Sequence, residues 1–269
     1  MATGTVTRRE GRFSGDRLAY RVWDAENPTA LVVIAHGYAE HSGRYDHVGA
    51  ALAEAGFAAW ALDHFGHGLS EGDERGNAGS VDDAVADMDE FVTLASASAP
   101  SLPVFLIGHS MGGLLAVAYA EQHQDRLAGL VVTGAAVVLS EMLSALLDLD
   151  EIPAVSLAPF VSRDPAVVQA YDDDPLNYHG AMPREMLEKA PERIGAVRDN
   201  FGKISIPILV MHGEQDGLAP MQAALDIING VSSSDRSLRI WPGLFHEIFN
   251  EPERDAVIGE AVRWIAQRV

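Results

Sequence analysis

The residues with the clearest chemical meaning are Gly108-His109-Ser110-Met111-Gly112, which fit the pattern Gly-x-Ser-x-Gly. An apolar run over 104–107 precedes them, and a helix-forming segment over 114–122 follows them. Strand, sharp turn and helix in this order are the context in which the pattern marks a nucleophile elbow. The elbow strains the serine backbone and pushes its hydroxyl outward, and the flanking glycines remove Cβ atoms that would collide. We therefore predict that Ser110 is a nucleophile; the alternative is a glycine-rich turn with an incidental serine.

A serine nucleophile requires a general base, and the base requires an acid that fixes its tautomer. In folds built on such an elbow, the acid and then the histidine follow the serine along the chain, each in a loop after a late strand. Asp216 follows the apolar run 206–212, and His246 follows the shorter run 238–241. We predict these two as the acid and the base. The alternatives are an ordinary turn aspartate and a surface histidine, and the rival acid Glu214 sits closer to its strand end.

Other histidines are less suited to these roles. His212 belongs to a predicted strand, and the geometry of the elbow is expected to point His109 away from the reaction. His64 and His67 lie in a loop without the accompanying ligands that a metal site needs, so no metal is expected. The glycine-rich segment 66–72 lacks the spacing and the lysine of a phosphate-binding loop.

An acyl-transfer serine also needs hydrogen-bond donors for the oxyanion that forms on the attacked carbonyl. One is typically the backbone N–H of the residue after the nucleophile, which here is Met111. The second comes from the loop after an earlier strand, where His36-Gly37-Tyr38 is found. We predict that the Tyr38 amide is this donor, that Gly37 allows close backbone approach, and that His36 is a structural hydrogen-bonding residue.

The elements that must position these residues alternate between buried strands and amphipathic helices, which predicts an α/β fold with a mostly parallel sheet covered on both faces. The hairpin 13–22, with its turn at Gly15-Asp16, is expected to pair antiparallel at the edge. Strands are predicted at 31–35, 57–62, 104–107, 127–133, 206–212 and 238–241, and helices at 45–55, 80–97, 114–122 and 255–268.

The alternation of strands and helices stops over residues 139–203, where the sequence predicts several helical pieces bounded by prolines and no buried strand. We predict one domain over 1–269, with a core formed by 1–138 and 204–269 and with 139–203 inserted as a helical cap over the carboxyl edge of the sheet. An apolar stripe begins this insertion and comprises Leu139, Met142, Leu143, Leu146 and Leu147. The stripe either faces the core or lines the entrance for an acyl chain.

Composition excludes several classes of function. The formal net charge of −20 opposes binding to nucleic acid or to anionic lipid surfaces. With no cysteine there is no disulfide and no thiolate chemistry. No apolar run is long enough for a transmembrane segment. Arg8, Arg9 and Arg12 are not followed by an apolar leader segment, so a cytoplasmic location is expected, with peripheral contact to membranes or lipid droplets as an option.

Four segments together resemble the monoacylglycerol lipase group of the α/β-hydrolases, which are serine aminopeptidase-like enzymes. They are His36–Tyr45, Asp63–Gly72, Gly108–Gly113 and Asp174-Pro175-Leu176. The resemblance covers nearly the whole chain and is closest to bacterial members. Ser162–Tyr171 and Asn250–Arg254 resemble the actinobacterial members in particular.

This resemblance implies an α/β-hydrolase fold, a cap over an acyl slot, and hydrolysis of monoacylglycerols through an acyl-enzyme without a cofactor. It implies that Glu40 and Arg44 lie near the glycerol end of the site, although an ion pair that merely fixes the loop would look the same. Tyr38 is bulkier than the alanine of mammalian members, which changes the shape on the alcohol side. A lysophospholipase, a general carboxylesterase and a noncatalytic ligand-binding protein are the alternatives, and the oligomeric state is not predicted.

Overall fold

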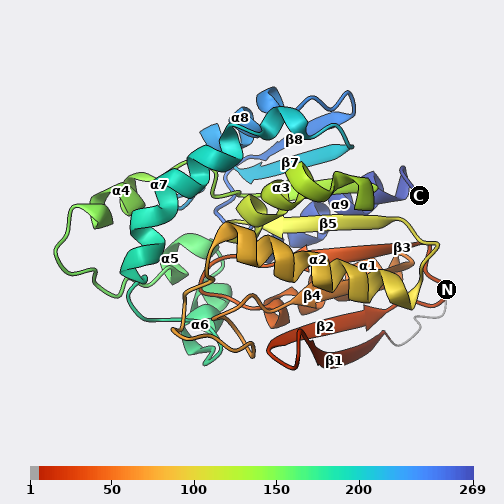
Figure 1. The fold of residues 1–269 in the computed structure, drawn as a ribbon, viewed down its shortest axis with the longest axis horizontal. Coiled ribbons are helices and arrows are strands. Elements are labelled where there is room, and N and C mark those ends of the chain that lie inside the picture. The colour runs from red at the N-terminus through yellow and green to blue at the C-terminus, as the bar shows by residue number, and fades with distance from the viewer. Residues whose placement is uncertain (1–5) are drawn as a thin grey trace.

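A single eight-stranded sheet forms the centre of the molecule, with strand order β1-β2-β4-β3-β5-β6-β7-β8 (Figure 1). The structure is a computed structural model that describes residues 6–269. Its strands are β1 (Thr7–Phe13), β2 (Leu18–Asp24), β3 (Ala30–Ala35), β4 (Phe57–Leu62), β5 (Val104–His109), β6 (Gly129–Thr133), β7 (Ile208–Gly213) and β8 (Arg236–Trp241). The first two strands pair antiparallel, and β3 to β8 run parallel to one another. The predicted mostly parallel sheet with an antiparallel edge hairpin is therefore confirmed.

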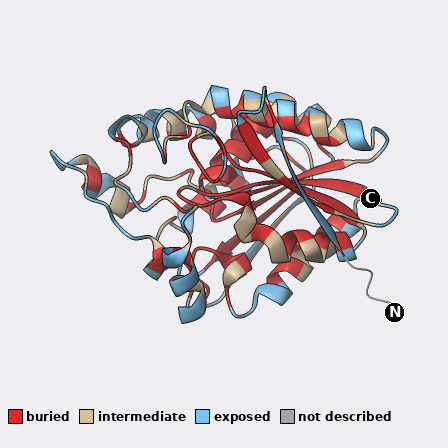
Figure 2. Cartoon of the chain, turned by 90° about the horizontal axis from the view of Figure 1, so that it is seen from below, coloured by how far each residue is buried: buried red, intermediate tan, exposed pale blue. Residues whose placement is uncertain are grey.

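Both faces of the sheet are covered by helices, and the side chains of β3 show why. Leu31 and Val33 point into one apolar core, whereas Val32 and Ile34 point into the other. Figure 2 shows the strands buried between helices whose outer faces are exposed. The first core is covered by α2 (Val81–Ser98), α3 (Met111–His123) and α8 (Gln222–Gly230), and the second by α1 (Asp46–Glu54) and α9 (Arg254–Ala266).

The helix α8 between β7 and β8 was not among the helices predicted from the sequence. The others lie where the sequence signals place them. Ser80 caps α2 by accepting a hydrogen bond from the Asp83 amide at 3.0 Å. Each of these helices contributes buried apolar residues to one of the two cores. This packing holds the ends of the strands, and therefore the loops that follow the strands, in fixed positions.

The segment 139–203 is helical, and the structure assigns no strand to it. It contains α4 (Glu141–Leu147), α5 (Ala158–Val161), α6 (Pro165–Asp173) and α7 (Arg184–Arg198). These helices gather beyond one end of the sheet, the end at which β5 leads into α3 (Figure 1). Pro191 lies inside α7 and does not end it.

Backbone hydrogen bonds join residues 139–203 to the loops that follow the strands. The Tyr178 amide donates to the carbonyl oxygen of Ala39 at 2.9 Å, and the Glu247 amide donates to that of Val161 at 2.8 Å. The inserted helices are therefore held at the loops that carry the predicted site. Among the described residues, no helix is both long enough and apolar enough to cross a bilayer. Residues 1–5, part of the segment considered for a leader, lie outside the described residues.

Candidate active site

Ser110 stands between β5 and α3 in a strained backbone conformation. Its φ of 54° and ψ of −118° lie in a region that non-glycine residues rarely occupy. The turn is closed tightly by its glycines. A Cβ on Gly112 would lie 2.2 Å from the carbonyl oxygen of Ala35, and one on Gly108 would lie 2.4 Å from the carbonyl oxygen of Gly112. The sequence Gly-x-Ser-x-Gly thus folds into the sharp elbow that presents the Ser110 hydroxyl.

Ser110, His246 and Asp216 form one hydrogen-bonded chain, although they are far apart in the sequence. The Ser110 Oγ lies 2.9 Å from His246 Nε2, and His246 Nδ1 lies 2.7 Å from Asp216 Oδ2. The other carboxylate oxygen of Asp216 accepts from the amides of Leu218 and Ala219, each at 2.8 Å. These bonds fix the carboxylate so that His246 carries its proton on Nδ1 and offers Nε2 to the serine.

Glu214, the rival acid, is exposed and is not part of this chain. Its carboxylate instead accepts from the Gly243 amide at 3.0 Å.

Electrostatics suit His246 to accept a proton. Burial alone would lower its pKa, but the charge of Asp216 and the hydrogen bond to it raise the pKa above the usual histidine value. Burial likewise opposes ionisation of Asp216, and the same contact with His246 keeps the Asp216 pKa below its ordinary value. An ionised aspartate paired with an imidazole of raised basicity is the arrangement needed to stabilise an imidazolium during proton transfer.

The expectation that His109 points away from the site is wrong. Its ring centroid lies 4.7 Å from that of His246, and it lines the same cavity as Ser110. Its Nδ1 is 2.9 Å from the Thr133 hydroxyl oxygen. Burial and the neighbouring His246 lower the pKa of His109 to about 3, so the ring is neutral at pH 7 and packs against the base.

The two residues predicted to supply the oxyanion donors lie at the elbow and in the loop after β3. Met111 is the first residue of α3, so its N–H has no partner within the helix. Tyr38 follows Gly37, whose position is crowded: a Cβ there would lie 3.1 Å from the Ser110 Cβ. The loop is held by the Gly37 amide, which donates to Glu40 Oε1 at 2.7 Å, and by buried His36, which is 2.7 Å from the Gly37 carbonyl oxygen.

Glu40, Arg44 and Glu247 form a buried ion-pair cluster beside the serine. Arg44 donates to Glu40 Oε2 at 2.9 Å and to both carboxylate oxygens of Glu247, at 2.7 Å for Oε2. Its guanidinium also lies 4.6 Å from the ring centroid of Tyr171 in α6. Glu40 and Glu247 line the cavity above Ser110, whereas Arg44 does not. Sequence reasoning did not identify Glu247, whose only signal is its position next to His246.

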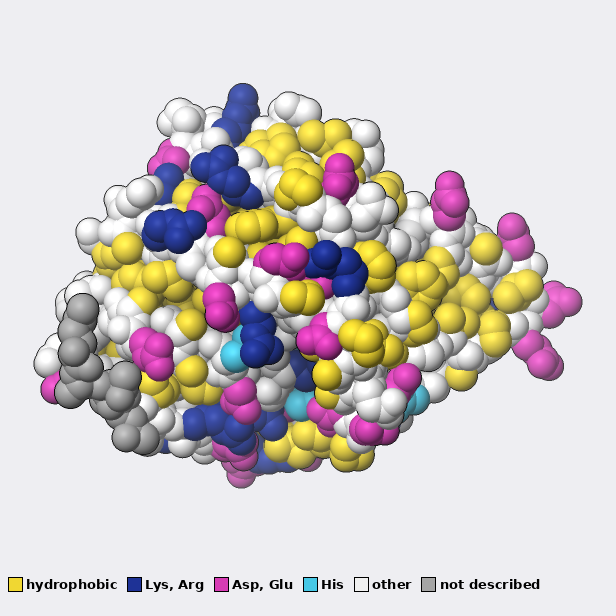
Figure 3. All heavy atoms as spheres, turned by 180° about the vertical axis from the view of Figure 1, so that it is seen from behind, with side chains coloured by type: hydrophobic (Ala, Val, Ile, Leu, Met, Phe, Trp, Pro, Cys, Tyr) yellow, Lys and Arg dark blue, Asp and Glu magenta, His cyan; other side chains and the backbone are white. Residues whose placement is uncertain are grey.

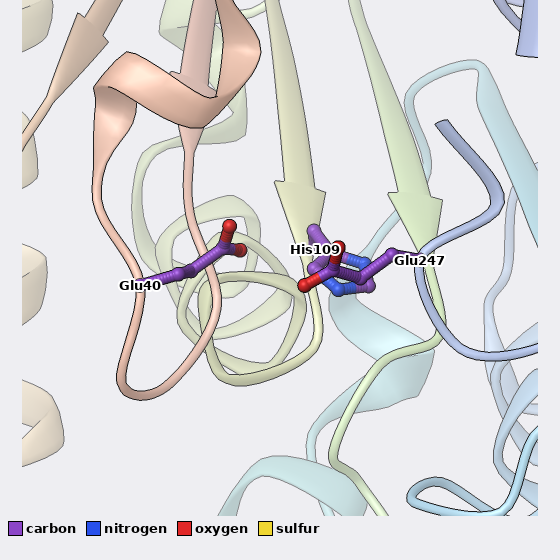
Figure 4. A group of neighbouring side chains, drawn as sticks. All are labelled: Glu40, His109 and Glu247. Carbon is purple, nitrogen blue, oxygen red and sulfur yellow. The ribbon is translucent and has the colours of Figure 1, made fainter. Parts of the chain in front are cut away.

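Glu40, His109 and Glu247 each offer one possible ligand atom, and these atoms lie within 4.8 Å of one another. Figure 4 shows the three side chains. Such a group can hold a metal ion in principle, but Arg44 already supplies the positive charge that the two carboxylates require. Burial and the charge of Glu247 raise the pKa of Glu40 to about 7. Burial opposes ionisation of Glu247 too, but Arg44 keeps the Glu247 pKa below its usual value. The donor set therefore fits an arginine better than a metal.

A large, mostly apolar cavity opens above Ser110. It encloses about 1160 Å³ of empty space including its open mouth. Its walls come from the loops of the core and from the insertion, with Met142 and Leu143 of α4 and Met186 of α7 among them. Part of the apolar stripe predicted in the insertion thus lines the cavity, while Leu146 is buried. A cavity of this kind suits a substrate with a long apolar part.

The family model described as Hydrolase_4, "Serine aminopeptidase, S33", matches residues 26–253. The monoacylglycerol lipase of Mycolicibacterium smegmatis is 37% identical and covers 98% of this chain and 99% of its own. The monoglyceride lipase of Homo sapiens is 31% identical over 94% of this chain and 88% of its own.

A solved structure from Saccharomyces cerevisiae, a soluble variant of monoglyceride lipase in complex with a substrate analog, superposes with a TM-score of 0.85. It is 21% identical and covers 99% of this chain and 97% of its own. That likeness, together with the sheet order, confirms the predicted α/β-hydrolase fold. The elbow geometry, the full-length match to relatives and the family match agree, and the chain belongs to the Hydrolase_4 family of serine aminopeptidase-like hydrolases.

Proposed function

We propose that this protein is a serine hydrolase that cleaves monoacylglycerols to a fatty acid and glycerol. The observation that carries the proposal is the hydrogen-bonded chain from Ser110 through His246 to Asp216 at the floor of a large apolar cavity. The names of the similar bacterial and human proteins support the same substrate class. No cofactor takes part in this chemistry.

In the proposed mechanism, Ser110 Oγ attacks the ester carbonyl while His246 Nε2 takes the serine proton. The carbonyl oxygen becomes an oxyanion, which the amides of Tyr38 and Met111 stabilise; loss of one such donor costs about 3 kcal/mol of transition-state stabilisation. His246 then protonates the departing glycerol oxygen. Water repeats the cycle on the acyl-enzyme and releases the fatty acid, while Asp216 holds the imidazolium in place.

The two sides of the cavity support the two halves of the substrate. Apolar side chains from α3, α4 and α7 provide a wall for the acyl chain. Glu40 and Glu247 are the acidic groups near Ser110, and their carboxylates can accept hydrogen bonds from glycerol hydroxyls. Arg44, which binds both, positions these carboxylates from behind the wall. In this proposal Glu40 contacts the glycerol, and Arg44 acts through Glu40 and Glu247.

The test is the initial rate of hydrolysis of matched monoacyl-, diacyl- and triacylglycerols and of lysophosphatidylcholine by the purified protein and by Ser110→Ala. We expect monoacylglycerol to be preferred and its hydrolysis to be lost in the variant. Serine-dependent hydrolysis spread evenly over these esters would contradict the substrate, and a preference for lysophosphatidylcholine would favour a lysophospholipase. Turnover that survives in Ser110→Ala would contradict the mechanism.

We further propose that the protein is cytoplasmic and that it contacts lipid surfaces transiently through residues 139–203. Leu149, Val155 and Phe160 are large apolar side chains that are exposed there, and Figure 3 shows hydrophobic atoms covering this end of the molecule, with acidic groups at its tip. The acidic groups favour an uncharged lipid surface over an anionic one. In a flotation assay, neutral phosphatidylcholine vesicles should retain the protein more than anionic vesicles, and Leu149→Ser should weaken retention. Equal retention on both vesicles would refute this.

A further inference from the structure

The cavity above Ser110 adjoins a second hollow that the proposed reaction does not use. This second hollow, which we call the α7 groove, encloses about 980 Å³ including open solvent and is lined by α2, α3 and α7. The cavity and the α7 groove share Ser80, Val81 and Arg193 in their walls. These residues therefore form the boundary between the two spaces.

The α7 groove lies farther along α3 than the cavity does. Leu114 and Leu115 of α3 line the cavity, whereas Ala118 and Gln122 line the α7 groove. At about 1.5 Å per helical residue, Ala118 lies roughly 12 Å along the helix from Ser110. The boundary thus stands at the end of the cavity that is distant from the serine, where the tail of an acyl chain would end.

Arg193 is a charged residue of this boundary on a helix that otherwise gives the cavity apolar side chains. It lies on the same face of α7 as Met186 and Ala190, which line the cavity, and next to Ile194, which also lines it. Of the residues that the structure describes, Arg193 is the only lysine or arginine in the wall of the cavity. Within residues 6–269 its guanidinium has no salt bridge, although Lys189 one turn earlier pairs with Glu192 at 3.5 Å. Arg193 is therefore the charged residue in a part of the wall to which α7 otherwise contributes apolar side chains.

The α7 groove beyond Arg193 is lined mostly by polar and charged side chains. Glu121, Glu185 and Glu192 line the α7 groove, opposed by Lys189 and Arg193. The buried Oε1 atom of Glu121 has no hydrogen-bond partner among the described residues. A methylene chain that passed Arg193 would desolvate these groups. The groove therefore does not extend the acyl site.

We infer that Arg193 is a specificity-determining residue that closes the acyl end of the cavity and sets the longest acyl chain that the enzyme hydrolyses efficiently. The inference rests on the proposed function, because it assumes that the acyl chain occupies this cavity. Chains that end before Arg193 can contact the apolar side chains that α3, α4 and α7 contribute to the cavity wall. Longer chains must displace the guanidinium or bend, so each added methylene gains little transition-state stabilisation.

The experiment measures kcat/KM for a series of monoacylglycerols of increasing chain length at a fixed detergent concentration. It compares the wild type with Arg193→Leu, Arg193→Lys and Lys189→Leu. Lys189→Leu is the matched control, because it removes a cation from the same helix that lines only the α7 groove. Melting temperatures verify that each variant is folded.

We expect Arg193→Leu to raise the ratio of long-chain to short-chain kcat/KM roughly tenfold, since a methylene or two in an apolar pocket changes kcat/KM by that order. Arg193→Lys should keep most of the wild-type profile, and Lys189→Leu should keep all of it. The inference is overturned if Arg193→Leu leaves the chain-length profile unchanged, or if Lys189→Leu shifts it equally. Failure of the proposed function would appear differently, as an absence of Ser110-dependent hydrolysis at every chain length.

Discussion

Acid should destabilise this protein steeply, because three histidines in the loops that follow β3 and β4 are buried in the neutral form. His36, His64 and His67 are at most 2% exposed, and the ring centroids of His64 and His67 lie 4.5 and 5.6 Å from that of His36. The His36 Nε2 atom accepts a hydrogen bond from the His64 amide at 3.0 Å, which it cannot do when protonated. Burial is the main cause that lowers the pKa of His64 to about 3 and that of His67 to about 4, and it takes the His36 pKa well below its usual value.

The magnitude follows from linkage. Each of these histidines binds a proton in the unfolded chain below about pH 6.5 but not in the folded protein, so stability is lost as the pH falls from that value toward the folded pKa. Each histidine lowers the free energy of unfolding by about 1.4 kcal/mol for each pH unit, which gives about 2 kcal/mol per histidine between pH 6.5 and pH 5. Three histidines give about 6 kcal/mol, which is comparable to the whole stability of a typical domain.

The assay is urea unfolding at pH 6.5 and pH 5 of the wild type, His67→Gln and His179→Gln. Glutamine cannot titrate, so His67→Gln should lose about 2 kcal/mol less than the wild type over this interval, whatever its stability at pH 6.5. His179 is exposed and serves as the control. An equal loss of stability in the wild type and His67→Gln would refute the reasoning.

Three further predictions concern the site. Asp216→Asn should reduce kcat by about 10⁴, because the amide favours the wrong tautomer of His246; a loss below tenfold would contradict this role. Gly112→Ala should abolish activity and lower the melting temperature, since its Cβ would lie 2.2 Å from the Ala35 carbonyl oxygen; a folded, active variant would contradict the elbow geometry. Glu247→Gln should move the acidic limb of the kcat/KM profile to lower pH. The charge of Glu247 raises the His246 pKa, so its removal should lower that pKa, and His246 must be neutral to act as the base. A pH–rate series in which the limb stays in place would contradict this coupling.

The fold was largely predictable because its signals are local. The buried strands are continuous apolar runs, and Ser80 marks the start of α2 by its own side chain. The helix α8 was missed, although its start is marked no less clearly than the starts of α1 and α9: none of the three has a side-chain cap at its N-terminus. The path of α7 through Pro191 was equally hidden, since tertiary packing overrides the tendency of proline to end a helix.

The candidate site also has features that the sequence predicted and features that it did not. The order of Ser110, Asp216 and His246 along the chain was readable, because each follows a strand, and parallel strands bring such loops to one edge. Contacts between distant segments were not readable. The pairing of Arg44 with Glu247, which the chain separates by 203 positions, depends on the packing of two loops. The approach of His109 to His246 likewise depends on the exact turn of the elbow.

The backbone bonds at Val161 and Tyr178 affect how residues 139–203 could be exchanged between relatives. Because Val161 and Tyr178 hold the loops of His246 and Ala39, a transplanted insertion must reproduce the backbone at both positions before its own side chains matter. The stretch from α4 to the start of α5 carries neither bond, so it is the part that can be replaced, shortened or randomised while the two anchors stay in place. A library confined to 141–157 would therefore vary the cavity wall without disturbing the catalytic loops.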